Sequence, residues 1–144
     1  MKNSITRKIE IDMGHRIPNH KSKCRNIHGH RYIFEACVSG KNVRVKGASD
    51  EGMIIDFSDL KEAMMKEIHE RLDHGFMMYD NDPFAPQFRK FHSQKIIFVP
   101  FVPTAENIAK YTYGLLKPKL ASKKMKLENI TVWETPNSSA SYND

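Results

Sequence analysis

The chain has little of what stabilises secreted proteins or anchors membrane proteins. Only two cysteines occur in its 144 residues, too few for a disulfide framework, so we expect a reducing compartment. No apolar run approaches the ~20 residues of a membrane-spanning helix, and residues 1–5 lack the apolar stretch of a signal peptide. Internal repeats and low-complexity tracts are also absent from the sequence. We therefore predict a cytoplasmic protein with one domain over residues 1–144 and no membrane partner.

The composition is that of an ordinary globular domain with an excess of positive charge. Hydrophobic residues make up 40% of the chain and charged residues 28%, which is enough for a packed core. The formal net charge of +6 predicts an anionic partner. Nucleic acid, a membrane surface and a phosphorylated small molecule would all satisfy that prediction.

The stretch from Cys24 to His30 concentrates side chains that bind metals. It holds one thiol and two imidazoles within seven residues. His28 and His30 open the segment 28–38, whose β-branched and aromatic residues are typical of a strand. Residues two apart in a strand point to the same face, so both imidazoles can converge on one ion. Neutral imidazole suits Zn²⁺, Cu, Ni or Fe, and zinc is the metal we expect.

A third histidine lies on an earlier segment with strand periodicity. From Ile5 to Met13 the odd positions are mostly apolar and the even positions polar, which predicts a half-buried strand. His15 continues the inward, odd face after Gly14. Alone, it would be interpreted as a buried histidine bonded to a backbone carbonyl. Beside His28 and His30, it is interpreted as the third ligand of the predicted site.

Two helices are predicted in the second half of the chain. The first begins at Asp56 or Ser58 as N-cap and ends near residues 72–75, with Gly75 as C-cap. Its expected core-facing stripe consists of Phe57, Leu60, Met64, Ile68 and Leu72. The second begins after Thr104, a good N-cap, and ends at Pro118.

Short strands are predicted over residues 52–55, 95–99 and 129–134, with an irregular segment over 77–91 and a loose tail over 137–144. Strand pairs followed by helices predict an α+β fold, an antiparallel sheet with both helices on one face. The exposed edges of one such sheet are normally covered or paired, so we expect an oligomer that closes a β-barrel.

Asp73, His74 and Glu134 are ambiguous by position alone. Asp73 and His74 fall at a helix terminus, where a capping histidine beside a solvated acid is the commoner arrangement. Glu134 shares a strand face with Ile130 and Val132, as either an edge residue or a pocket carboxylate. The pattern leaves both alternatives open.

Five motifs in register give the chain a family resemblance. They are Gly14-His15-Arg16, Cys24-x-x-x-His28-Gly29-His30, Asp73-His74, the segment 103–107 (Pro-Thr-Ala-Glu-Asn) and the segment 133–136 (Trp-Glu-Thr-Pro). Together the chain resembles the 6-pyruvoyl-tetrahydropterin synthase superfamily. Within it, the chain is most similar to the 6-carboxy-tetrahydropterin synthases of the queuosine (7-deazaguanine) pathway. The resemblance runs from about Ile5 to Pro136 and is weak over residues 77–101.

The resemblance implies roles for particular residues. His15, His28 and His30 match three zinc ligands that leave a fourth position for substrate or water. Cys24 matches the catalytic cysteine, and Asp73 and His74 match an acid–base pair. The substrate-binding matches are Glu134, which anchors the pterin, and Thr104, which borders its pocket.

The resemblance also implies a fold, an assembly and a reaction. The fold is the tunnelling fold, assembled into a hexamer of two trimers with sites at subunit interfaces. The substrate is 7,8-dihydroneopterin triphosphate, and the products are 6-carboxy-tetrahydropterin, acetaldehyde and triphosphate. A triphosphate fits the positive net charge, and no direct nucleic-acid partner is expected.

Three alternatives stand beside this interpretation. The sister enzyme makes 6-pyruvoyl-tetrahydropterin from the same substrate by eliminating triphosphate. A folate-pathway relative has an altered cysteine position, whereas Cys24 is present here. A basic zinc module for nucleic acid would use Cys24 as a fourth, structural ligand. That module is disfavoured because such sites space two ligand pairs by a dozen or so residues, and because no aromatic residues interleave with a basic stripe.

Overall fold

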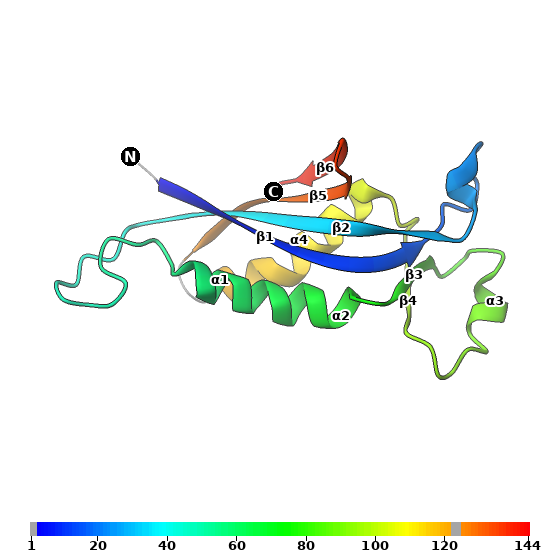
Figure 1. Ribbon diagram of the computed structural model, residues 1–144, viewed down its shortest axis with the longest axis horizontal. Helices are drawn as coiled ribbons and strands as arrows, with labels where there is room; N and C mark the ends of the chain where they lie inside the picture. Colours follow the sequence, from blue (N-terminus) through cyan, green and yellow to red (C-terminus); the bar gives the residue numbers. More distant parts are fainter. Residues whose placement is uncertain (1–2, 122–124) are drawn as a thin grey trace.

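The computed structural model describes residues 3–121 and 125–144, which form one twisted sheet with helices packed on it (Figure 1). The sheet has six strands in the order β4-β3-β1-β2-β5-β6. Their bounds are β1 Asn3–His15, β2 His28–Gly40, β3 Phe76–Tyr79, β4 Ile96–Val99, β5 Lys126–Thr135 and β6 Ser138–Tyr142. The principal helices are α1 Phe57–Met64, α2 Glu70–Leu72 and α4 Ala105–Ala121, with the short α3 at Ala85–Phe88.

β1 and β2 are the long central pair, and their register positions the candidate site. They run antiparallel along their whole length, from Asn3 opposite Gly40 to His15 opposite His28. Ile9, Ile11 and Met13 of β1 are buried, while the residues between them are more exposed, as the alternation predicts. The same alternation in β2 buries Tyr32, Phe34, Ala36 and Val38.

The predicted first helix is a single run, but its middle is π-helical. A π turn, Met65–His69, separates α1 from α2. Leu60, Met64, Ile68 and Leu72 are all fully buried and follow one another at intervals of four. In a regular α-helix this spacing drifts by about 40° per step around the axis. The wider π turn offsets the drift, so the whole row faces the sheet. Phe57 was wrongly assigned to the row, because its side chain is 54% exposed.

The second helix, α4, begins as predicted and ends later than predicted. The Thr104 hydroxyl accepts the Asn107 N–H at 3.3 Å, so Thr104 is the N-cap. Pro118 lies inside the helix rather than at its end. The residue four positions earlier is Gly114, which is exposed and has no atom within 4 Å of a would-be Cβ, so this outer face has room to deform around the proline ring.

Several predictions of local structure are wrong. The sheet is mixed rather than antiparallel, because β3 pairs in parallel with both β1 and β4. Residues 52–55 form no strand, although Ile54 and Ile55 are buried. The expected loose tail contains β6, which pairs antiparallel with β5. The helix before β3 ends through a left-handed residue at His74, with φ 57°, and not at Gly75.

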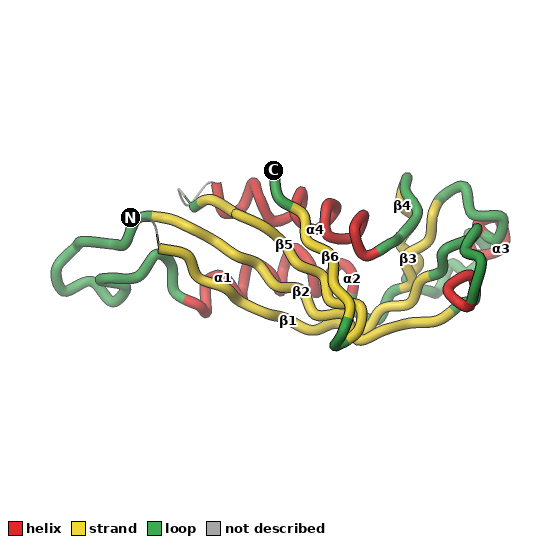
Figure 2. The backbone as a smooth tube through the Cα atoms, turned by 90° about the horizontal axis from the view of Figure 1, so that it is seen from above, coloured by secondary structure: helices red, strands yellow, loops and turns green. Residues whose placement is uncertain are grey.

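The two faces of the sheet differ in their cover. Figure 2 shows α1, α2 and α4 behind one face, with the strands forming the opposite layer. Leu60, Ile108 and Leu116 of these helices are fully buried, in one core with the inward residues of β1, β2 and β5. On the other face Lys8, Glu10 and Arg31 are exposed. Across the described ranges, no helix is both long and apolar enough to cross a bilayer.

Candidate metal centre and active site

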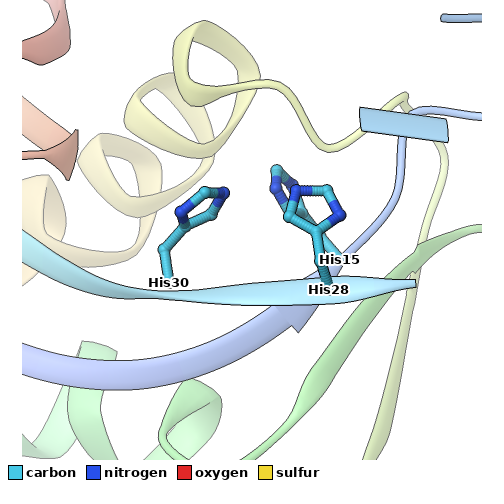
Figure 3. Close-up of side chains that lie close together, drawn as sticks. All are labelled: His15, His28 and His30. Atoms are coloured by element: carbon cyan, nitrogen blue, oxygen red, sulfur yellow. The ribbon is translucent and has the colours of Figure 1, made fainter. Parts of the chain in front are cut away.

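Three imidazoles meet on the core-facing side where β1 ends and β2 begins. His15 closes β1 opposite His28, and His30 lies two residues further along β2. One ring nitrogen of each lies within 4.8 Å of the others, about twice a Zn–N bond of ~2.1 Å. Figure 3 shows the three rings on the same side of the ribbon, facing the segment that leads into α4. The sequence-predicted ligands are therefore brought together.

Backbone carbonyls fix which nitrogen of two rings faces the cluster. The Nδ1 of His15 lies 2.7 Å from the carbonyl oxygen of Pro103, and the Nδ1 of His28 lies 2.7 Å from that of Asn26. A carbonyl only accepts, so each Nδ1 carries the proton and each Nε2 keeps its lone pair. The buried Nε2 atoms of His15 and His30 have no hydrogen-bond partner. This donor set fits a metal ion, which would accept those lone pairs.

Burial favours the neutral form of two of the three rings. Burial, together with the nearby His28 and His30, lowers the pKa of His15 to about 4, despite the opposing bond to Pro103. Burial also lowers the pKa of His30, although Glu134 opposes this. Neutral imidazole is the form that binds a metal, so the lowered pKa values of His15 and His30 favour the form in which both rings can act as ligands.

Glu134 lies at the open side of the cluster. Its carboxylate is 3.6 Å from His30 Nε2 and 3.9 Å from His15 Nε2. The depressed pKa values of both rings leave these as contacts between a carboxylate and neutral imidazoles, not as ion pairs. In the described part of the chain, the set of mutually close ligand atoms contains the three histidines without Glu134. Glu134 is therefore free to face a ligand bound beside the histidines.

Tyr32 is a member of this site that the sequence analysis did not identify. Its ring centroid lies 5.8 Å from that of His15 and 5.5 Å from that of His30. Its buried hydroxyl has no hydrogen-bond partner. Burial raises the pKa of Tyr32, and Glu134 and Cys24 add to that rise. Tyr32 continues the face of His28 and His30, which is the signal that could have identified it.

Cys24 and Thr104 flank the cluster from two connections. Cys24 lies in the 3₁₀ turn Lys23–Arg25 of the β1–β2 loop, half-buried, and its backbone carbonyl accepts the Ile17 N–H at 2.9 Å. The Cys24 thiol contributes to the raised pKa of Tyr32, which indicates that the thiol lies close enough to the Tyr32 hydroxyl to interact with it. Thr104 follows Pro103, whose carbonyl binds His15, and caps α4.

Asp73 and His74 are not brought to the histidine cluster within one chain. The Asp73 Oδ2 accepts a 2.7 Å hydrogen bond from His74 Nδ1. Both residues line a pocket of about 210 Å³ with Glu10, Asp12 and Arg31, the exposed side chains of the uncovered sheet face. His74 is 79% exposed. The pair is thus formed and accessible beside the backbone of Asp12 in β1. His74 also lines a pocket of about 470 Å³ with Gly29 and His30, but no hydrogen bond or ion pair among the described residues joins it to the three histidines.

A second pocket, of about 360 Å³, lies beside the Cys24 turn and is lined in part by Arg16 and Arg25. Arg16 is buried, 3.0 Å from Asp82, with its guanidinium over the Phe84 ring. Arg25 donates to the carbonyls of Lys21 and Ser22 and forms no ion pair with a described acidic residue. Its charge is therefore available to an anion.

The comparisons with known proteins agree over nearly the whole chain. Residues 4–144 match the family model described as 6-pyruvoyl tetrahydropterin synthase. The chain is 39% identical over 135 residues to a 6-carboxy-5,6,7,8-tetrahydropterin synthase of Rickettsia bellii, covering 92% of this chain and 94% of that protein. It is 35% identical to the protein of that name from Haemophilus influenzae, covering 97% and 98%.

Solved structures show the same fold. A Wolinella succinogenes protein superimposes with a TM-score of 0.81 at 22% identity, covering 100% of this chain and 99% of that one. The 6-pyruvoyl tetrahydropterin synthase of Caenorhabditis elegans superimposes with a TM-score of 0.69 at 24% identity, covering 100% and 96%. The family model and the relatives confirm the resemblance seen in the five motifs: the chain belongs to the 6-pyruvoyl tetrahydropterin synthase family of enzymes.

Proposed function

We propose that this protein is a zinc-dependent 6-carboxy-5,6,7,8-tetrahydropterin synthase acting in the cytoplasm in queuosine or other 7-deazaguanine biosynthesis. It would convert 7,8-dihydroneopterin triphosphate to 6-carboxy-tetrahydropterin, acetaldehyde and triphosphate. The observation that carries the proposal is the convergence of His15, His28 and His30, with Glu134 facing His15 and His30. The names of the relatives at 35–39% identity support the choice of reaction.

His15, His28 and His30 would hold the zinc ion. Bound there, zinc would act as a Lewis acid that makes a coordinated hydroxyl and the adjacent C–H of the substrate side chain more acidic. Three protein ligands fit a catalytic site, which keeps a position open, better than a closed structural site.

The remaining residues would bind the substrate and move protons. The amino-pyrimidinone edge of a pterin offers adjacent N–H donors, and the Glu134 carboxylate can accept both. Cys24, in the 3₁₀ turn of the loop between β1 and β2, would act as a proton-transfer group. His74, held by Asp73, would be its partner, since an imidazole can both accept and donate a proton. Thr104 would border the pterin.

The separation of the two groups of residues supports an oligomer. Asp73 and His74 lie on the uncovered sheet face, so they would reach the histidine cluster of a neighbouring subunit rather than their own. We propose a hexamer of two trimers, in which strand edges of adjacent subunits pair and close a barrel.

The second candidate is the sister reaction that yields 6-pyruvoyl-tetrahydropterin. It is favoured by the Caenorhabditis elegans structure of that name, which shares the fold. The 6-carboxy reaction cleaves a carbon–carbon bond of the side chain and releases acetaldehyde, whereas the 6-pyruvoyl reaction eliminates triphosphate without that cleavage. Zinc-loaded protein incubated with 7,8-dihydroneopterin triphosphate should give acetaldehyde and a pterin with the mass of the 6-carboxy product. Formation of the 6-pyruvoyl product without acetaldehyde would favour the sister enzyme, and no turnover of either kind would refute both.

A further inference from the structure

The Asp73 carboxylate has a second imidazole neighbour besides His74. The Nε2 of His69, one helical turn earlier, lies 3.6 Å from the same Oδ2 atom that His74 contacts at 2.7 Å. The other carboxylate oxygen, Oδ1, accepts the backbone N–H of Asp12 at 3.0 Å. One oxygen of Asp73 therefore faces two ionisable rings, while the other is held by the sheet.

The backbone fixes this trio from both ends. His69 is the last residue of the π turn Met65–His69. The Asp73 N–H donates a 2.9 Å hydrogen bond to the His69 carbonyl oxygen. His74 adopts the left-handed conformation and donates its N–H to the Asp12 carbonyl at 2.7 Å. The Lys95 ammonium bonds the Asp73 carbonyl at 2.8 Å. A π turn and a left-handed non-glycine residue are both uncommon, and both occur next to Asp73.

We propose that His69 is a positioning residue for the Asp73–His74 pair, acting through the shared carboxylate and not through contact with the substrate. The inference rests on the proposed function for its catalytic meaning. When His69 is neutral, its Nε2 can share in holding Oδ2. When it is protonated, its positive charge competes with His74 for the same negative charge. The protonation state of His69 therefore alters how strongly Asp73 holds the proton of His74.

The partial burial of His69 and Asp73 limits the screening of this interaction by water. The side chain of His69 is 31% exposed, and that of Asp73 is 20% exposed, so water screens the contact only in part. Partial burial raises the pKa of Asp73, but the bonds from Asp12 and His74 and the charge of His69 lower it further, so the net change is a decrease. The charged and titratable groups that face the trio are Glu10 and Asp12 of β1, Arg31 of β2 and Lys95 before β4.

A titration followed by NMR tests the coupling without substrate. In the wild-type protein, the ring nitrogens of His74 should change in two steps with pH, one of which coincides with the titration of His69. His69→Gln should leave a single step, and His92→Gln, an exposed histidine outside this pocket, should leave both. In an Asp73→Asn background, His69→Gln should not alter the His74 signals. One-step behaviour in the wild type, or an equal effect in the Asp73→Asn background, would overturn the inference.

The catalytic consequence is read from kinetics. His69→Gln should lower kcat by about tenfold, since neighbouring groups that share one charged partner are coupled to about that extent, and should leave KM within about twofold. The low-pH limb of the wild-type kcat profile should depend on two protons, and that of His69→Gln on one. Turnover by the wild type with no change in His69→Gln overturns this inference alone. Absence of wild-type turnover refutes the proposed function, and the NMR titration then still decides whether the trio is coupled. If His69→Gln fails to fold, the two-step titration of the wild-type protein decides instead.

Discussion

The Nδ1–H of His15 donates to the carbonyl oxygen of Pro103, and this 2.7 Å hydrogen bond joins two parts of the molecule that are 88 residues apart. His15 closes β1, and Pro103 directly precedes the N-cap of α4. The bond orients one candidate ligand and anchors the start of a helix at the same time. Disturbance of the α4 N-terminus should therefore weaken metal binding as well as the helix.

The first prediction concerns the metal. We expect one zinc ion per chain, and alanine at His15, His28 or His30 should each reduce the zinc content well below one, since a ligand is lost. Metal analysis of the purified variants measures this. His92→Ala, at an exposed histidine, should keep the full zinc content. A variant of the cluster with unchanged stoichiometry would exclude that residue from the site.

The second prediction concerns Cys24. Cys24→Ala should retain zinc and the oligomer, while turnover falls by roughly 10²- to 10⁴-fold, as for loss of a general acid or base. Cys37→Ala, at the other cysteine, is the matched control and should keep its activity. Release of zinc from the Cys24 variant would instead identify the thiol as a fourth ligand.

The third prediction concerns Glu134. Glu134→Ala should weaken pterin binding by removing the acceptor for adjacent N–H donors, and zinc should remain bound by the three histidines. Calorimetric titration with a non-reactive pterin and metal analysis measure the two effects separately. Glu128→Ala, at a carboxylate on the same strand that instead bonds Ser39, is the control. Unchanged pterin affinity would argue against the anchoring role.

The fourth prediction concerns pH. The folded-state pKa of His15 is lowered to about 4 from an ordinary value of 6.5, so between these values the unfolded chain binds a proton there that the folded chain does not. The stability of the metal-free protein should thus be complete above pH 6.5 and decrease as pH falls toward 4, by up to about 3 kcal/mol from this residue. Urea unfolding at several pH values measures it. His15→Asn should show a smaller decrease over the same range.

The fifth prediction concerns assembly. Light scattering at micromolar concentration should give the proposed hexamer, because β4 and β6 are the edge strands of the described sheet and each has a strand partner on one side only. A monomer mass together with full activity would contradict both the assembly and the shared site.

The histidine cluster could be predicted from sequence because its information is local. The alternation in residues 5–13 and 28–38 fixes which side chains share a face, and antiparallel pairing then joins His15 to His28. The position of Asp73 and His74 relative to the cluster had no such local signal. It depends on how the helix packs across the sheet, which only long-range contacts determine.

The missed strands have different causes. β3 has only four residues and forms parallel pairs, where strands are continuous apolar runs without alternation. β4, predicted over residues 95–99, is confirmed. β6 has the sequence Ser-Ser-Ala-Ser-Tyr, with little strand propensity, and is formed by pairing with β5. Gly75 was predicted as the C-cap, but the left-handed residue is His74. A Cβ at Gly75 would lie 2.4 Å from the terminal methyl of Ile97 and 3.1 Å from the Leu72 carbonyl oxygen, so a larger residue there would require the Ile97 side chain to move.

The π turn gives the helix before Asp73 one residue more than regular α-helical geometry needs. If one exposed residue of the turn, Lys66, were removed, the intervals between successive buried residues would become four, three and four. That is the spacing of an ordinary amphipathic helix. Leu60 and Leu72 could then keep their places on the sheet. Alignments of this family should accordingly tolerate a one-residue gap here without losing the Asp73–His74 pair that follows.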